Sequence, residues 1–328
     1  MKKEHVIGLC FIAVIVGVSI MAVLLLPPSP DQKTTSIISL SNLSASTSGE
    51  VVGGVSSHKI VLDAAITKGP DQVTVYKTQP TVVTKADAIE FAKKFNITYY
   101  NDPKEGDAVI SVSSKDMRYN VMLYKNGGKR YSDYHRIDTP NGIDIPENLP
   151  SDEDAVKIAT EFLKARDLLP DGAVFSKSIH DKTYKLNRSG GEPTVVRENI
   201  ELGYSRKIDG MRIEGTQFMV GVGANGDVIS YFVNWKEYEP IGEYPVKSGE
   251  TAFTELKQNG VNVGSGPEKP DKISIDQAYM AYYTKALAYP EDYLEPVWVF
   301  KGTASVNGKT ITPVTEYIPA LTDDAVKS

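Results

Sequence analysis

The chain has 328 residues and a formal net charge of −6 at pH 7, with 36 Lys and Arg residues against 42 Asp and Glu residues. This acidic balance excludes a general nucleic-acid binder, because such proteins need a basic face that displaces counterions from phosphates. The single cysteine, Cys10, excludes an intramolecular disulfide and a cysteine-based zinc site. The length is sufficient for two ordinary domains.

The N-terminal segment 6–26 predicts a membrane anchor. It carries no charge, and as a helix it would span about 31 Å, close to the roughly 30 Å of a bilayer core. Lys2 and Lys3 lie in residues 1–5 and no basic cluster follows the segment, so the positive-inside rule places the N-terminus in the cytoplasm and the later residues outside the membrane. A cleaved signal peptide is the alternative, although its apolar region is typically about 7–15 residues long.

Residues 27–57 are predicted to form a stalk. Half of the stretch KTTSIISLSNLSASTSGE, which begins at Lys33, is Ser or Thr, and such a stretch is too polar to bury a core. Three sequons in the chain mark glycosylation acceptors if the host has the machinery, and they lie at Asn42, Asn96 and Asn187.

Four later segments share a helix-initiation pattern. Each begins with Ser or Thr, has a short polar residue three positions later and an alanine at the fourth position; the first residues are Thr84, Ser151, Ser248 and Ser274. The hydroxyl can accept a hydrogen bond from an unpaired N–H of the first turn, and the polar residue can bond back to the cap. We therefore expect a helix at each of the four positions.

Strands are expected between these helices. Three Asn-Gly pairs, at 126–127, 225–226 and 307–308, are flanked by alternating apolar residues and predict hairpins. The expected fold class is therefore α+β, with an N-terminal transmembrane helix followed by two extracytoplasmic units of antiparallel sheet with helices packed on one face. The first unit is expected at 58–146 and the second at 147–328, with a boundary rich in Pro, Asn and Gly.

These motifs resemble the PepSY-like group of extracytoplasmic domains. The resemblance lies in YSRKIDGMRIEG and VGVGANGDVISYFVNW, then in YPVKSGETAFTEL, ISIDQAYMAYY and YLEPVWVFKG, and covers about residues 204–321 with a weaker echo at 84–137. The group includes propeptide modules of secreted metalloproteases and the membrane-anchored YycH/YycI regulators, which restrain a sensor histidine kinase. We expect no protease domain after these motifs, so the resemblance implies regulation of another protein or inhibition of a protease in trans.

The sequence contains no recognisable catalytic motif. The four histidines lack metal-ligand spacing and there is no G-x-S-x-G motif, so we expect neither an enzyme nor a cofactor nor a metal. The acidic run Ser151–Ala155 fits a calcium site or negative charge at a helix N-terminus, and we favour the second. The carboxylates of Glu291, Asp292 and Glu295 could act as acid and base, although acidic turns are commoner.

Tyrosines gather near the last predicted helix. Tyr279, Tyr283 and Leu287 are expected to pack as one helical stripe on the sheet. Tyrosine suits interfaces because it combines a large contact area with a polar tip, so a second set is predicted to contact a partner: Tyr282, Tyr289 and Tyr293.

The expected function is a non-enzymatic, membrane-tethered, extracytoplasmic module that binds and modulates another membrane or secreted protein. Docking is expected on the sheet of residues 204–235, through its face or an edge strand. The alternatives are a protease inhibitor acting in trans and a structural protein of the cell envelope. The expected partners are the membrane, through residues 6–26, and a protein, but not nucleic acid.

Overall fold

The computed structural model describes residues 38–39, 55–56, 59–137, 148–185, 191–263, 270–287 and 289–327. The predicted anchor at 6–26 lies outside these residues, as do most of the predicted stalk and the sequons at Asn42 and Asn187.

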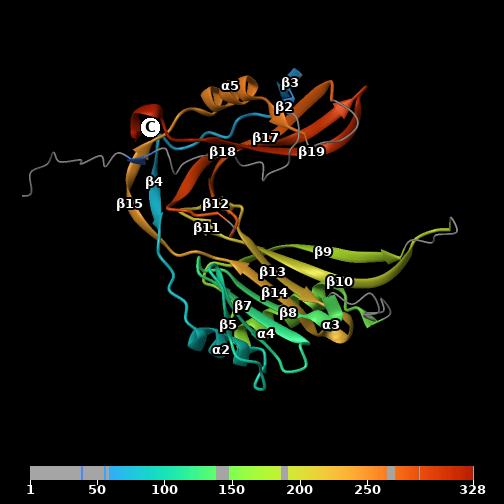
Figure 1. The fold of residues 1–328 in the computed structure, drawn as a ribbon. Coiled ribbons are helices and arrows are strands. Elements are labelled where there is room, and N and C mark those ends of the chain that lie inside the picture. The colour runs from blue at the N-terminus through green and yellow to red at the C-terminus, as the bar shows by residue number, and fades with distance from the viewer. Residues whose placement is uncertain are drawn as a thin grey trace, which may run out of the picture. The chain divides into compact units, whose positions relative to one another are not determined.

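The first of two large sheets has eight strands and is antiparallel throughout (Figure 1). In spatial order the strands are β5 (Lys104–Glu105), β6 (Val109–Ser113), β7 (Tyr119–Tyr124), β8 (Lys129–Asp133), β14 (Val228–Asn234), β13 (Gln217–Val222), β10 (Thr194–Ser205) and β9 (Val174–Lys185). The sheet consists of two four-stranded halves, which meet where β8 pairs with β14. Each half follows a helix in the sequence, so a helix with four sheet strands occurs twice.

Three of the four predicted helices are confirmed. They are α2 (Lys85–Lys94), α4 (Asp152–Ala165) and α5 (Gly249–Asn259). In each, the hydroxyl of the preceding residue (Thr84, Ser151 or Ser248) accepts a hydrogen bond from the backbone N–H three residues later. The side chain of Asp87 also accepts from the backbone N–H of Thr84, which completes the predicted capping box.

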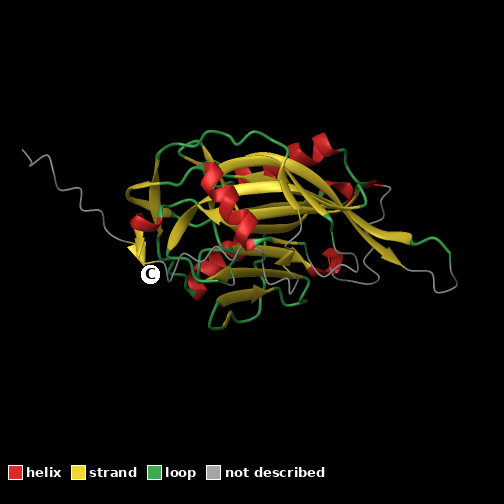
Figure 2. Ribbon diagram, turned by 90° about the horizontal axis from the view of Figure 1, so that it is seen from above, coloured by secondary structure: helices red, strands yellow, loops and turns green. Residues whose placement is uncertain are grey.

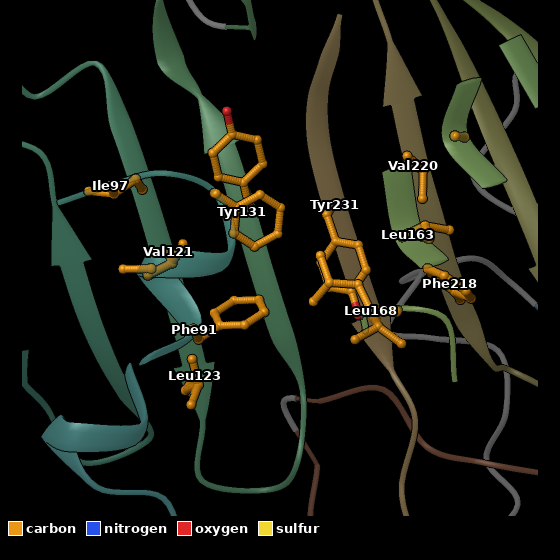
Figure 3. Close-up of a cluster of buried hydrophobic side chains, with 14 of the residues drawn as sticks. Phe91, Ile97, Val121, Leu123, Tyr131, Leu163, Leu168, Phe218, Val220 and Tyr231 are labelled. Carbon is orange, nitrogen blue, oxygen red and sulfur yellow. Dashed lines mark hydrogen bonds between the residues drawn. The ribbon is translucent and has the colours of Figure 1, made fainter. Parts of the chain in front are cut away.

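The helices α2 and α4 cover one face of the first sheet, and the larger core lies between them and the strands. Figure 3 shows Phe91 of α2 among side chains of the central strands, including Tyr131 and Tyr231. Phe218 and Val220, which precede the predicted turn at 225–226, are at most 1% exposed and belong to this core. Full burial of each such apolar side chain stabilises the fold by roughly 1.5–3 kcal/mol relative to leaving it exposed. The core therefore determines which face of the sheet packs on the helices and which face points away from them.

All three predicted hairpins are confirmed. The Asn-Gly pairs connect β7 to β8, β13 to β14, and β18 to β19. Asn225 and Asn307 have φ of 62° and 50°, each followed by a glycine with positive φ. These left-handed conformations give the turn a twist that matches the flanking strands.

The second sheet also has eight strands, but it is mixed. Its main path runs β11 (Lys207–Ile208), β12 (Met211–Glu214), β17 (Lys272–Tyr283), β18 (Tyr293–Val306), β4 (Gln72–Thr78) and β15 (Tyr238–Pro245), and it is extended by β3 (Lys59–Leu62) and β19 (Lys309–Pro319). Both β12 and β3 pair with β17 in parallel. The helix α5 packs on one face, where the core includes Leu256 and Trp298.

The remaining described elements are short. The strand β1 (Ile38–Ser39) pairs with β20 (Val326–Lys327), and β2 (Val55–Ser56) pairs with β16 (Val261–Asn262). A short helix, α3 (Tyr134–Ile137), follows β8. Two 3-10 turns, at Ala224–Gly226 and Asp323–Ala325, complete the described secondary structure.

The expected fold class is wrong. The described chain is mostly β, as Figure 2 shows, and its second sheet contains parallel pairs. Among the described residues, none of the helices has the length and hydrophobicity needed to cross a bilayer, and the anchor predicted at 6–26 lies outside these residues.

The segment from Ser274, predicted as a helix, is the strand β17. Ile273 and Ile275 are buried on one face, and a bulge between Ile275 and Gln277 shifts the alternation so that Ala278 continues on that face. The extra residue in the bulge gives the apolar residues of β17 a spacing that is similar to that of a helix. The Ser-x-x-Gln sequence at the start of the segment is also similar to a helix cap. The preference of β-branched and aromatic residues for a pleated surface decides the structure.

The sheets do not follow the boundary predicted between residues 146 and 147, which lies outside the described residues. Strands from both sides of it share the first sheet, where β8 pairs with β14. The strands β3 and β4, from the N-terminal side, pair with β17, β18 and β15 of the second sheet.

Candidate functional site

The two ends of the first sheet are its edge strands, β5 and β9. The strand β5 has 2 residues, whereas β9 has 12 and pairs along nearly its whole length with β10. Among the described residues no strand pairs with the other side of β9. Because an edge strand presents unpaired N–H and C=O groups, β9 offers a long template for a further strand.

The side chains of β9 are unusually exposed for apolar residues in a sheet. Val174 is 60% exposed, Phe175 and Ile179 are each 41% exposed, and Tyr184 is 53% exposed. These apolar residues are spread over both faces of the strand, and exposed apolar side chains on an unpaired edge strand favour an interaction along that edge. The ribbon of β9 and β10 is long enough to be followed clearly in Figure 1.

The strand β9 is locally basic in an acidic protein. Its sequence VFSKSIHDKTYK holds three lysines and one aspartate, against a net charge of −6 for the chain. Lys182 lies 3.4 Å from Glu198 of β10, but Lys177 and Lys185 make no ion pair with any described residue. The edge therefore presents uncompensated positive charge.

One face of β9 is fastened to the start of α4. The imidazole of His180 lies between two carboxylates, with Nδ1 2.6 Å from Glu198 Oε1 and Nε2 2.8 Å from Asp152 Oδ1. The hydroxyl of Ser178 also donates to Asp152. The hydrogen bonds to Glu198 and Asp152 raise the pKa of His180 above its ordinary value, and the bonds from Ser178 and His180 lower the pKa of Asp152.

Of the docking platform predicted at 204–235, only the short strand β11 lies at the end of a sheet, the second one. Its strands β13 and β14 lie in the middle of the first sheet and are paired on both sides. The edge strand β9 was not anticipated from the sequence, because both of its faces are exposed and its apolar alternation is therefore weak. The exposed Phe175, Ile179 and Tyr184 in a strand-like run are the signal that could have located it.

The structure does not bring the predicted partner tyrosines onto one surface. Tyr282 is fully buried and donates its hydroxyl to Thr74 O at 2.6 Å, so it cannot contact a partner. Tyr293 is half-buried against the core of the second sheet, and only Tyr289 is exposed, at 44%. Tyr279 and Tyr283 lie on β17, not on a helix, on the face opposite Tyr282.

The carboxylates near residue 290 occupy different environments. Glu291 forms a buried ion pair with Lys236, at 2.6 Å, and accepts from Thr284. Glu295 is 3% exposed, and neither of its oxygens has a hydrogen-bond partner among the residues that the structure describes. Burial raises the pKa of Glu295 to about 7; Lys285 partly opposes this shift and Glu291 adds to it. Glu291 and Glu295 are therefore not arranged as an acid and a base around a shared substrate, because Glu291 is already in an ion pair with Lys236.

The acidic run predicted at Ser151–Ala155 lies in and just before the first turn of α4. Asp152 and Asp154 occupy that turn, where negative charge favours a helix N-terminus. Among the described residues no group of three or more His, Cys, Asp or Glu side chains is arranged to hold a metal. Asn96, the one sequon residue described, is exposed just after α2.

No protein-family model matches the sequence, and no curated protein matches it. A solved structure of an uncharacterised protein from Eubacterium rectale matches this chain with a TM-score of 0.46 and 11% identity, over 79% of this chain and 87% of that one. The resemblance to the PepSY-like group stays a prediction.

Proposed function

We propose that the chain is a protein-binding module that takes up an extended segment of another polypeptide as an added strand along β9. The observation that carries the proposal is the unpaired edge of β9, with 12 residues and four exposed apolar side chains. In this mode of recognition, backbone hydrogen bonds supply affinity and alternate side chains supply specificity. The module modulates the protein whose segment it holds, because a segment held on β9 cannot make its own contacts elsewhere.

The charge of the edge indicates the chemistry of the segment. Lys177 and Lys185 lack ion-pair partners among the described residues, so acidic side chains on the added strand would lie close to them. Opposite charges on neighbouring strands stabilise a pair, and like charges directly opposite destabilise it. A second copy of β9 would place lysines near lysines, so the edge favours an acidic, apolar-alternating partner over self-association.

The proposal is tested with synthetic peptides of about eight residues that alternate valine with glutamate. Binding to the full-length protein is measured by calorimetry. Two further peptides are N-methylated on every second residue, one at the odd and one at the even positions. Only one of them loses the N–H groups that face β9. We expect one methylated peptide to lose binding and the other to retain it.

The matched control peptide alternates valine with lysine and is expected to bind at least about tenfold more weakly. Equal binding of the acidic and basic peptides, or equal binding of both methylated peptides, would contradict strand addition along a basic edge. Dimerisation of the protein through β9 without peptide would favour the structural alternative.

A further inference from the structure

The face of the first sheet that points away from α2 and α4 contains a cavity of about 310 Å³. Along β10, Ile200 and Leu202 point to the helices and belong to the core, so Asn199 and Glu201 point to this opposite face. The cavity receives side chains from five neighbouring strands, including Arg130 of β8, Phe232 of β14 and Asp181 of β9. It does not include the outer edge of β9.

A largely buried carboxylate forms one end of the polar lining. Glu201 Oε1 accepts from Asn199 Nδ2 at 2.8 Å and from Ser230 Oγ at 3.4 Å, whereas Oε2 has no hydrogen-bond partner among the described residues. Burial, and secondly the charge of Asp181, raise the pKa of Glu201. The carboxylate lies across Gly221, where a Cβ would come within 2.7 Å of Oε1, so the absence of a side chain there makes room for it.

Two arginines supply donors that the protein does not fully use. The Nε of Arg197 is buried and has no hydrogen-bond partner in the described part of the chain, and its terminal nitrogen lies 3.9 Å from Asp181. Arg130 donates from Nε to Ser132 at 3.1 Å and makes no ion pair with any described residue. Buried polar groups are nearly always paired in proteins, so an unpaired donor beside a cavity points to a missing acceptor.

We propose that this cavity binds a small zwitterion, a molecule of amino-acid to dipeptide size that carries one ammonium and one carboxylate group. The ammonium group donates to Glu201 Oε2, and the carboxylate group accepts from the arginines. Two acidic and two basic side chains line the cavity, so a ligand with no net charge leaves it balanced. Met219 and Phe232 provide an apolar surface for the rest of the ligand, and the volume is near the lower limit of small-molecule sites.

The test uses four probes on the full-length protein, measured by calorimetry up to about 10 mM. Leucine and leucyl-leucine carry both charged groups and separate a free amino acid from a peptide as the source. N-acetyl-leucine lacks the ammonium group and leucinamide lacks the carboxylate. We expect at least one of the first two to bind, and each blocked leucine to bind at least about tenfold more weakly than leucine itself if leucine is the ligand.

Two variants assign the binding to this cavity. Glu201→Gln and Arg130→Gln are each expected to weaken binding about tenfold or more, while Glu243→Gln, on the exposed part of β15, leaves it unchanged. Glu201→Gln is nearly isosteric, and thermal unfolding checks that it folds. Absence of binding by both zwitterions, binding of either blocked leucine as tight as the binding of leucine where leucine binds, or full binding by both cavity variants would overturn the proposal. None of these outcomes depends on whether a strand adds to β9.

Discussion

The two ends of the first sheet differ, although the sheet is built from two similar halves. The strand β5 has 2 residues, and its Glu105 forms ion pairs with Lys125 at 3.3 Å and Lys85 at 4.0 Å. The strand β9 has 12 residues and exposes four apolar side chains. Proteins protect sheet edges with short strands and charges. The comparison therefore indicates that the sheet is closed to a further strand at β5 and open to one at β9.

The largest predicted effect concerns Glu295, which lies in the second sheet and makes the free energy of unfolding of the whole fold depend on pH independently of β9. The pKa of Glu295 is raised to about 7 from 4.5, so its buried carboxyl group destabilises the fold increasingly from pH 4.5 to pH 7. At about 1.4 kcal/mol per pKa unit the cost reaches roughly 3 kcal/mol above pH 7. Glu295→Gln should therefore raise the free energy of unfolding by roughly 3 kcal/mol at about pH 8 and little at about pH 4.5. Equal effects at both pH values, measured with urea, would show that ionisation is not the cause.

The next effect concerns the charge of the open edge. Reversing the two lysines that make no ion pair with a described residue, Lys177→Glu with Lys185→Glu, should weaken binding of the acidic peptide by about 1–2 kcal/mol, or roughly tenfold, because two attractions become repulsions. The matched control is Lys104→Glu on β5, which should leave the affinity unchanged. A similar loss in the control variant would mean that the peptide responds to net charge alone.

A smaller effect is expected from an apolar contact on β9. Ile179→Ala should weaken peptide binding by about 1 kcal/mol, or roughly fivefold, since part of the side chain's exposed area is covered by the added strand. The control is Val82→Ala, which removes methyl groups from a side chain that is 86% exposed and lies outside β9. Calorimetry with the same peptide measures both, and an unchanged affinity for Ile179→Ala would exclude this contact.

The smallest effect is local and depends on His180. Its pKa is raised in the fold, so the stabilisation it provides is complete below its ordinary value of 6.5 and is lost as pH rises through the folded-state pKa. Because the imidazole is 42% exposed, we expect only a few tenths of a kcal/mol. Nuclear magnetic resonance of the ring nitrogens should give a pKa above 6.5. Amide exchange of β9 should become faster as pH rises through this pKa, beyond the intrinsic effect of pH, and His180→Gln should remove that additional change. A pKa at or below 6.5 would contradict the two-carboxylate contact.

Local signals in the sequence were sufficient to predict those elements whose structure is determined by residues close together in the chain. A hydroxyl cap specifies the starts of α2, α4 and α5, and Asn-Gly pairs specify three hairpins, since both depend on contacts within a few residues. The same logic failed for β17, where a bulge after Ile275 disguised the alternation and a Ser-x-x-Gln start imitated a cap. Local rules cannot show that a neighbouring strand supplies the missing hydrogen bonds.

The candidate site was less predictable than the elements. Which strand becomes an edge depends on the pairing of β8 with β14, whose residues lie about one hundred positions apart, and no local pattern encodes it. Tyr282 was expected to contact a partner because tyrosine suits interfaces, yet the bulge in β17 turns it into the core. The residues that matter for binding, such as Lys177 and Ile179, have no distinctive motif.

The most direct test of strand addition is amide hydrogen exchange of the full-length protein with and without the acidic peptide. The account predicts that alternate residues of β9 exchange more slowly when the peptide is bound, because only every second N–H of an edge strand points outward. The two residues of β5 should be unaffected. Protection that is absent from β9, or that appears equally at β5, would contradict the claim that the sheet is open at β9 alone.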